Sequence, residues 1–137
     1  MNNRDMLIIK NSWSQVIAQP DNPGEVFYKQ LFTTAPYLIP MFKSDMENQH
    51  SKFSAMITYM VMHLQTIDDI QSEIEAMGKR HVHYGVEPEH YALVGKVLIT
   101  TLKTILDEAW NAETEDAWTR LYALWSTSMI KAAAELT

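Results

Sequence analysis

The apolar positions of this chain recur at helical spacing from one end to the other. Apolar residues three or four positions apart predict a first helix over residues 4–18. A break containing proline and glycine at residues 20–24 separates it from a second helix. That helix should stop before Pro36, because a residue preceding proline is pushed out of the helical conformation. No segment shows the two-residue alternation of a strand, so the pattern predicts an all-α chain.

The same spacing continues through the second half of the chain. The Ser-x-x-Glu spacing of residues 44–47 predicts a capping box at the start of a third helix. Asp68–Asp69 opens a shorter helix that ends at His81. Two long helices are predicted over residues 88–110 and 114–136. The expected architecture is therefore a set of seven helical segments with a corner between His81 and the last two helices.

Composition narrows the class of protein. The 137 residues are 47% hydrophobic and 20% charged, which fits one globular domain over residues 1–137. A net charge of -6 argues against nucleic acid as a partner. The sequence has no cysteine, which excludes disulfides, thiolate nucleophiles and iron–sulfur ligands. With no apolar signal core and no run long enough to span a bilayer, we expect a cytoplasmic protein that does not bind membranes.

Four short motifs carry a family resemblance. They are residues 27–32 in the second helix, residues 40–42 at a corner, and residues 89–95 and 116–118 in the last two helices. Their order and spacing resemble bacterial single-domain globins and the haem domain of flavohaemoglobins, over essentially the whole chain. The resemblance implies the globin fold, a 3-on-3 helical sandwich, with haem b and its iron as the cofactor.

The resemblance also implies an iron-binding and gas-binding set. His81 falls at the proximal iron ligand, and a neutral imidazole suits haem iron. Tyr28 falls at the distal tyrosine, and counting back from His81 without gaps puts Gln49 at the distal position. A phenol and an amide would both stabilise dioxygen, which carries partial negative charge when bound. The alternatives are a capping or surface role for His81, a core role for Tyr28 with its hydroxyl bonded to backbone, and a solvated Gln49.

A further group of residues should line the haem slot. Phe42 matches the corner phenylalanine that packs on the haem, and Tyr91 matches the tyrosine beside the proximal histidine. Most members of the group would serve equally well in a core made of protein alone. The predicted cofactor-binding residues are Phe42, Phe53, Ile57, His81, Val86, Tyr91, Val94 and Leu98.

The chain departs from the family pattern in places that bear on function. Ala133 stands where flavohaemoglobins have a glutamate near the proximal histidine, which weakens the case for a strongly polarised His81. Phe53 replaces a smaller aliphatic residue and should crowd the pocket. The connection before Gln49 is shorter than usual, so a rotation by one residue would aim His50 at iron. Without that rotation, His50 is expected to be a solvent-facing neighbour.

Several functions remain open on the sequence. The first is reversible binding of dioxygen, carbon monoxide and nitric oxide by a monomer or weak homodimer. The second is an enzyme, a nitric oxide dioxygenase that works with a separate reductase, since the chain contains no glycine-rich dinucleotide fingerprint. A six-coordinate redox or gas sensor would follow if His50 bound iron. A haem-free structural or sensory globin fold is the remaining alternative.

Overall fold

The computed structural model describes residues 2–42, 45–66, 71–83 and 86–134, except the side chains of residues 82 and 83. All regular structure in these residues is helical, which confirms the all-α prediction. None of the described helices is long and apolar enough to cross a membrane. The elements in chain order are α1 (Asn3–Ile17), α2 (Pro23–Thr34), η1 (Pro36–Met41), α3 (Met46–Met62), α4 (Gln71–His83), α5 (Pro88–Leu106), η3 (Asp107–Ala109) and α6 (Ala112–Ala134).

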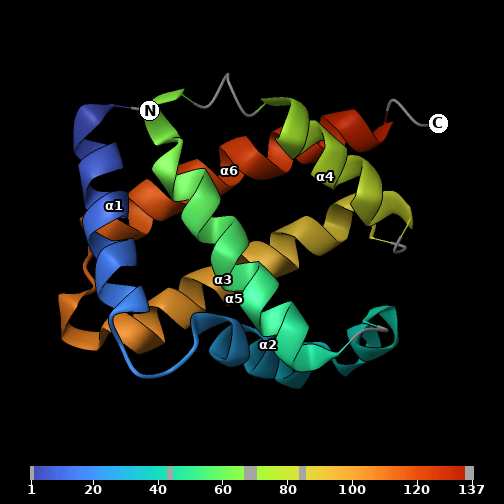
Figure 1. Cartoon of the computed structure of the whole chain (residues 1–137), viewed down its shortest axis with the longest axis horizontal. Helices are drawn as coiled ribbons and strands as arrows, with labels where there is room; N and C mark the ends of the chain where they lie inside the picture. The colour runs from blue at the N-terminus through green and yellow to red at the C-terminus, as the bar shows by residue number, and fades with distance from the viewer. Residues whose placement is uncertain (1, 43–44, 67–70, 84–85, 135–137) are drawn as a thin grey trace.

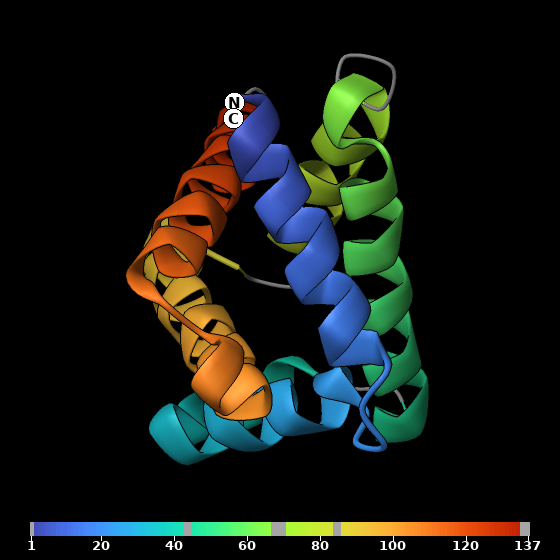
Figure 2. The ribbon, with the colours of Figure 1, turned by 90° about the vertical axis from the view of Figure 1, so that its left-hand side faces the viewer.

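The helices form two facing groups. Figure 2 shows α5 and α6 on one side, α3 on the other, and α2 running across the bottom. The last helix, α6, packs against α1, α4 and α5, while α2 packs against both α3 and α5. In Figure 1, α3 crosses in front of α5 and α6. This arrangement leaves α3 and α4 facing each other across the part of the molecule where the predicted site residues lie.

Asparagine residues fix the starts of three helices. The side chain of Asn2 accepts a hydrogen bond from the Asp5 backbone N–H at the start of α1 (2.8 Å). Asn22 accepts one from Gly24 at the start of α2 (2.8 Å), and Asn111 accepts one from Thr114 near the start of α6 (2.8 Å). Each bond satisfies a backbone donor that a helix start would leave without a partner. The predicted starts of these helices lie within about two residues of the observed ones.

The start of α3 and the end of α5 differ from the predicted boundaries. The cap of α3 is Asp45, whose carboxylate accepts the Glu47 backbone N–H at 3.1 Å; Ser44 lies outside the described residues. The fifth helix ends at Leu106 instead of residue 110, because Asp107 has a φ of 47°, which a continuing right-handed helix does not allow. The predicted opening at Asp68–Asp69 lies outside the described residues.

Two glycines let helices approach closely around the predicted site. A Cβ on Gly24 of α2 would overlap the backbone carbonyl of His50 in α3. A Cβ on Gly78 of α4 would overlap the backbone carbonyl of Met129 in α6. The first contact sets the crossing of α2 and α3, and the second sets that of α4 and α6. Each glycine therefore helps to place a helix that carries a predicted site residue.

Polar contacts join the first and last helices away from the site. The indole N–H of Trp118 donates to the hydroxyl of Ser12 (2.8 Å) within the core. Arg120 makes two hydrogen bonds to the Asp5 carboxylate, at 3.0 and 2.9 Å. The Asp5 side chain is only 7% exposed, whereas that of Arg120 is 55% exposed. The guanidinium thus compensates a carboxylate that is largely shielded from water.

Candidate functional site

Tyr28 of α2 lies at the centre of a group of rings, here called the Tyr28 cluster. Phe42 and Phe53 meet the tyrosine ring edge to face, with centroids 5.2 and 6.1 Å away. His50 lies more nearly parallel to it, at 5.7 Å and an interplanar angle of 29°. The cluster is completed by Phe27 and Phe32. Three predicted site residues, Tyr28, Phe42 and Phe53, are therefore brought together by α2, α3 and the corner after η1.

The Tyr28 side chain is largely buried and carries a hydroxyl that can donate a hydrogen bond. Tyr28 is 9% exposed, and its hydroxyl makes no hydrogen bond to any part of the chain that the structure describes. Burial raises the pKa of Tyr28 to about 12, because a phenolate would be poorly solvated there. The group therefore remains a protonated donor at neutral pH. The alternative in which this hydroxyl is bonded to backbone does not hold among the described residues.

His50 and Gln49 are neighbours on α3, and the structure shows that His50 contacts Tyr28. The His50 ring is half-buried and packs on Tyr28, so the expectation that His50 faces solvent was wrong. The cause is the close crossing at Gly24, which brings the backbone of His50 onto α2. Gln49, one position earlier, is also half-buried, and its distal role stays a prediction.

His81 lies near the end of α4 and is half-buried. Its Nδ1 is 2.6 Å from the backbone carbonyl oxygen of Met77, one helical turn earlier. The carbonyl can only accept, so Nδ1 carries the proton and Nε2 carries the lone pair of the neutral ring. Burial lowers the pKa of His81, the Met77 carbonyl opposes that shift, and Arg80 adds to it. The surroundings therefore favour a neutral imidazole, the form that binds a metal.

Tyr91 of α5 packs beside His81, with ring centroids 6.2 Å apart. The hydroxyl of Tyr91 is buried and has no hydrogen-bond partner within the described chain, and the same holds for the indole N–H of Trp125. Burial also raises the pKa of Tyr91. Tyr122 holds the backbone here, because its hydroxyl donates to the Tyr91 carbonyl at 2.7 Å. Buried donors without partners are uncommon in native proteins, so the Tyr91 hydroxyl beside His81 marks a place where a further group would fit.

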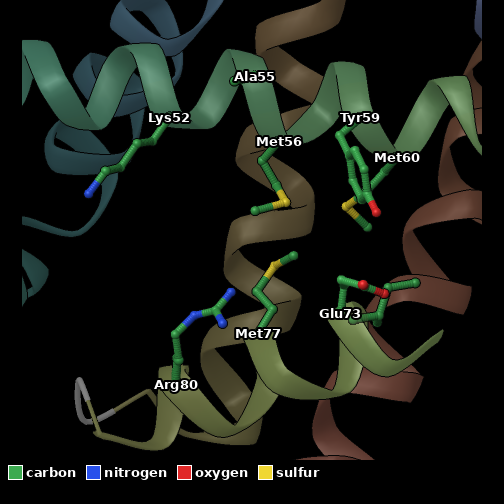
Figure 3. A pocket seen from close by; sticks show the side chains of 9 residues that line it. Lys52, Ala55, Met56, Tyr59, Met60, Glu73, Met77 and Arg80 are labelled. Carbon is green, nitrogen blue, oxygen red and sulfur yellow. The ribbon is translucent and has the colours of Figure 1, made fainter. Parts of the chain in front are cut away.

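A cavity of about 380 Å³ lies between α3 and α4. Figure 3 shows Met56 of α3 and Met77 of α4 pointing toward one another across it. Lys52 and Arg80 lie at one end, and the opposite end carries Tyr59 and Glu73. Ala55, Met60 and Ile74 complete the lining. None of the predicted site residues lines this cavity, but Met77 does, and its backbone carbonyl accepts the hydrogen bond from the His81 imidazole.

These features suit a flat, largely apolar cofactor with anionic groups on one edge. Methionine side chains adapt to a bulky ligand, and the exposed cations Lys52 and Arg80 can pair with carboxylates at the mouth. The described chain holds no group of three His, Asp or Glu side chains for a bare metal ion. A single imidazole is enough, however, for a metal already held by a macrocycle. The side chains present therefore fit haem.

The remaining predicted slot residues are divided between the core and its margin. Ile57 is 7% exposed and Leu98 is 2% exposed, so both are buried within protein. Phe42, Phe53, Val86 and Val94 are partly buried and pack against the core. Their contact with a cofactor stays a prediction. The sequence analysis did not identify Lys52 and Arg80, the two basic residues of the cavity. Their positions could have indicated them, because Lys52 lies about one helical turn after Gln49 and Arg80 directly precedes His81.

The Globin family model matches residues 25–129, more than half of the chain, and the chain therefore belongs to the globin family. That membership confirms the resemblance and the fold class. It also supports a haem cofactor and binding of diatomic gases such as dioxygen.

Individual relatives agree with this assignment. The chain is 24% identical to a flavohemoprotein of Bacillus subtilis over 133 residues, which is 95% of this chain and 33% of that protein. It thus spans about a third of the length of that relative. A bacterial globin of Campylobacter jejuni has the same fold, with a TM-score of 0.84, 24% identity and 98% coverage of both chains. An engineered carbene transferase, made from a Rhodothermus marinus protein described as a candidate nitric oxide dioxygenase, gives a TM-score of 0.89 at 18% identity, covering 99% of this chain and 95% of that one.

Proposed function

We propose that this globin reversibly binds dioxygen and other diatomic gases at a haem whose iron is held by His81. The observation that carries the proposal is the Tyr28 side chain, which is largely buried and stays protonated, and whose hydroxyl makes no hydrogen bond within the described residues. Haem would supply an iron that binds a diatomic gas. His81 would hold that iron, Tyr28 would donate a hydrogen bond to a bound gas that carries partial negative charge, and Gln49 is the proposed second donor.

One hydrogen-bond partner of the proposed proximal imidazole is a neutral group. The backbone carbonyl of Met77 orients the His81 ring without adding a negative charge, and Ala133 in α6 offers no carboxylate. A neutral acceptor donates less electron density through the imidazole than a carboxylate would. By itself, the Met77 contact does not strongly polarise the imidazole, which suits the reversible binding proposed here.

The cavity between α3 and α4 supports a proposal about which kind of haem is bound and how that haem is oriented. We propose haem b, held without covalent attachment, because the chain has no cysteine for a thioether link. Its carboxylate edge would lie toward Lys52 and Arg80, and its apolar part would lie between Met56 and Met77.

A second candidate is nitric oxide dioxygenase activity with a separate reductase. The similarity to the Bacillus subtilis flavohemoprotein over 95% of this chain favours it. Spectra of the purified protein in ferric, ferrous and carbonyl forms test the haem site, and oxygen titration of the ferrous form tests reversible binding. Consumption of nitric oxide is then measured with and without an added reductase. Stable, reversible oxygenation with slow turnover supports gas binding, whereas rapid reductase-dependent turnover supports the enzyme.

A further inference from the structure

His50 contributes the nitrogen-bearing ring of the Tyr28 cluster. Three of the four phenylalanine rings around Tyr28 are edge-on to it, at interplanar angles of 69° to 80°. Phe32 is tilted by 36°, and His50 has the smallest angle, 29°. A ring face at this distance and angle restricts tilting of the phenol toward α3, and such tilting would displace the hydroxyl at the far end of the ring. The ring of His50 therefore bears directly on the position of the Tyr28 hydroxyl.

The backbone beneath His50 restricts how far that ring can move. Gly24 lies one helical turn before Tyr28 on α2, and its missing Cβ leaves room for the His50 backbone. The same close crossing thus holds the Cα of His50 against the helix that carries Tyr28. From this backbone position, the His50 ring lies against the Tyr28 ring, with the centroids 5.7 Å apart.

We propose that His50 is a positioning residue for Tyr28, and that it sets how strongly this site discriminates dioxygen from carbon monoxide. The proposal rests on the proposed function, because it concerns a ligand held opposite His81. The imidazole acts through the phenol ring and does not itself contact the gas. Removing the ring would leave the Tyr28 hydroxyl present but less often aligned with the ligand.

The test compares His50→Phe, which retains a flat ring, with His50→Leu, which does not. Dioxygen and carbon monoxide off-rates are measured on the haem-loaded protein with each variant and with Tyr28→Phe. We expect His50→Leu to raise the dioxygen off-rate by about three- to tenfold and the carbon monoxide off-rate much less, as for partial loss of one hydrogen bond. His50→Phe should remain within about twofold of the unmodified protein, since it restores the ring contact.

The decisive measurement is the double variant, Tyr28→Phe with His50→Leu. If His50 acts through the Tyr28 hydroxyl, His50→Leu should have no further effect on gas off-rates once that hydroxyl is gone. An undiminished effect in the double variant would show that His50 touches the ligand itself. The proposal would also be overturned if His50→Leu left both off-rates unchanged.

The vibrational spectrum of the carbonyl form gives an independent readout. Loss of an aligned donor should shift the carbonyl stretching band in His50→Leu in the same direction as in Tyr28→Phe, whereas a merely structural substitution would leave it in place. A six-coordinate, low-spin ferrous spectrum that disappears in His50→Phe would overturn the proposal, because the imidazole would then occupy iron. If the proposed function itself were wrong, the unmodified protein would not bind dioxygen reversibly. That result can be told apart from every outcome described for the His50 variants.

Discussion

The Nδ1 nitrogen of His81 lies 2.6 Å from the backbone carbonyl oxygen of Met77, one turn earlier in α4. This bond selects the tautomer in which Nε2 carries the lone pair. It also joins the imidazole to the cavity, since Met77 lines the space between α3 and α4. One residue thus orients the proposed iron ligand and shapes the proposed slot.

We expect His81→Gly to lose haem during purification, because the substitution removes the proximal nitrogen. Free imidazole should restore binding, since the glycine leaves space for a ring of the same size. Haem content and the Soret spectrum, with and without imidazole, measure the outcome. His63→Gly, at the end of α3, is the matched control and should retain haem. Full haem content with an unchanged ferrous spectrum in His81→Gly would disprove the assignment.

Tyr28→Phe should raise the dioxygen off-rate by about one to two decades, because it deletes a hydrogen bond to a partly charged acceptor and little volume. The carbon monoxide off-rate should change much less. Flash photolysis or stopped-flow displacement measures both rates. Tyr37→Phe is the control, since Tyr37 is 68% exposed on η1. Equal effects on the two gases would remove Tyr28 as the donor.

Lys52→Gln and Arg80→Gln should each speed haem loss by roughly two- to fivefold, the effect of removing one exposed ion pair. Because both side chains are exposed, high salt should reduce the difference from the unmodified protein. Haem transfer to an acceptor protein measures the rate. Lys96→Gln, an exposed position on α5, should have no effect. If the cavity variants behave like Lys96→Gln, the proposed direction of the haem is wrong.

Gly78→Ala should lower the free energy of unfolding by about 1–3 kcal/mol, because the added methyl group would collide with the Met129 backbone and push α4 from α6. Since α4 carries His81, the affinity of the apoprotein for haem should fall as well. Denaturant unfolding and haem titration measure the two effects. Ser72→Ala, at an exposed position of α4, should change neither. A stable Gly78→Ala variant with normal haem affinity would show that this crossing can relax.

Acid should remove a stabilising contribution from Asp5. Hydrogen bonds from Arg120 lower the pKa of Asp5 below its unfolded value of about 4. The contribution is therefore fully present above the unfolded pKa and is lost as pH falls through the folded pKa. We expect Asp5→Asn to be less stable than the unmodified protein at pH 7, with the difference shrinking as the pH approaches 2.

Urea unfolding at several pH values measures this difference. Glu113→Gln is the matched control, because Glu113 pairs with Arg4 through the same kind of bond but both side chains are exposed, at 48% and 73%. Solvent screening should make its effect smaller. A difference between Asp5→Asn and the unmodified protein that does not depend on pH would contradict the linkage.

The sequence alone determined the helical class and most helix boundaries, since apolar spacing, prolines and asparagine caps act within a few residues of the chain. The second helix, α2, ends before Pro36, as predicted. The order of the four motifs indicated the globin family, which the family model confirms. Two boundaries differ from the prediction: Asp45 is the N-cap of α3, and the positive φ of Asp107 ends α5 early.

The tertiary structure decided which side chains meet. The orientation of His50 depends on the crossing at Gly24, a contact between residues 26 positions apart, so no local pattern could reveal it. The same holds for the cavity that brings Lys52 and Arg80 to one end. Only the packing of the helices shows that the buried Tyr91 hydroxyl has no hydrogen-bond partner within the described residues. Helical periodicity specifies which face of a helix is buried, but only packing specifies which partner that face finds.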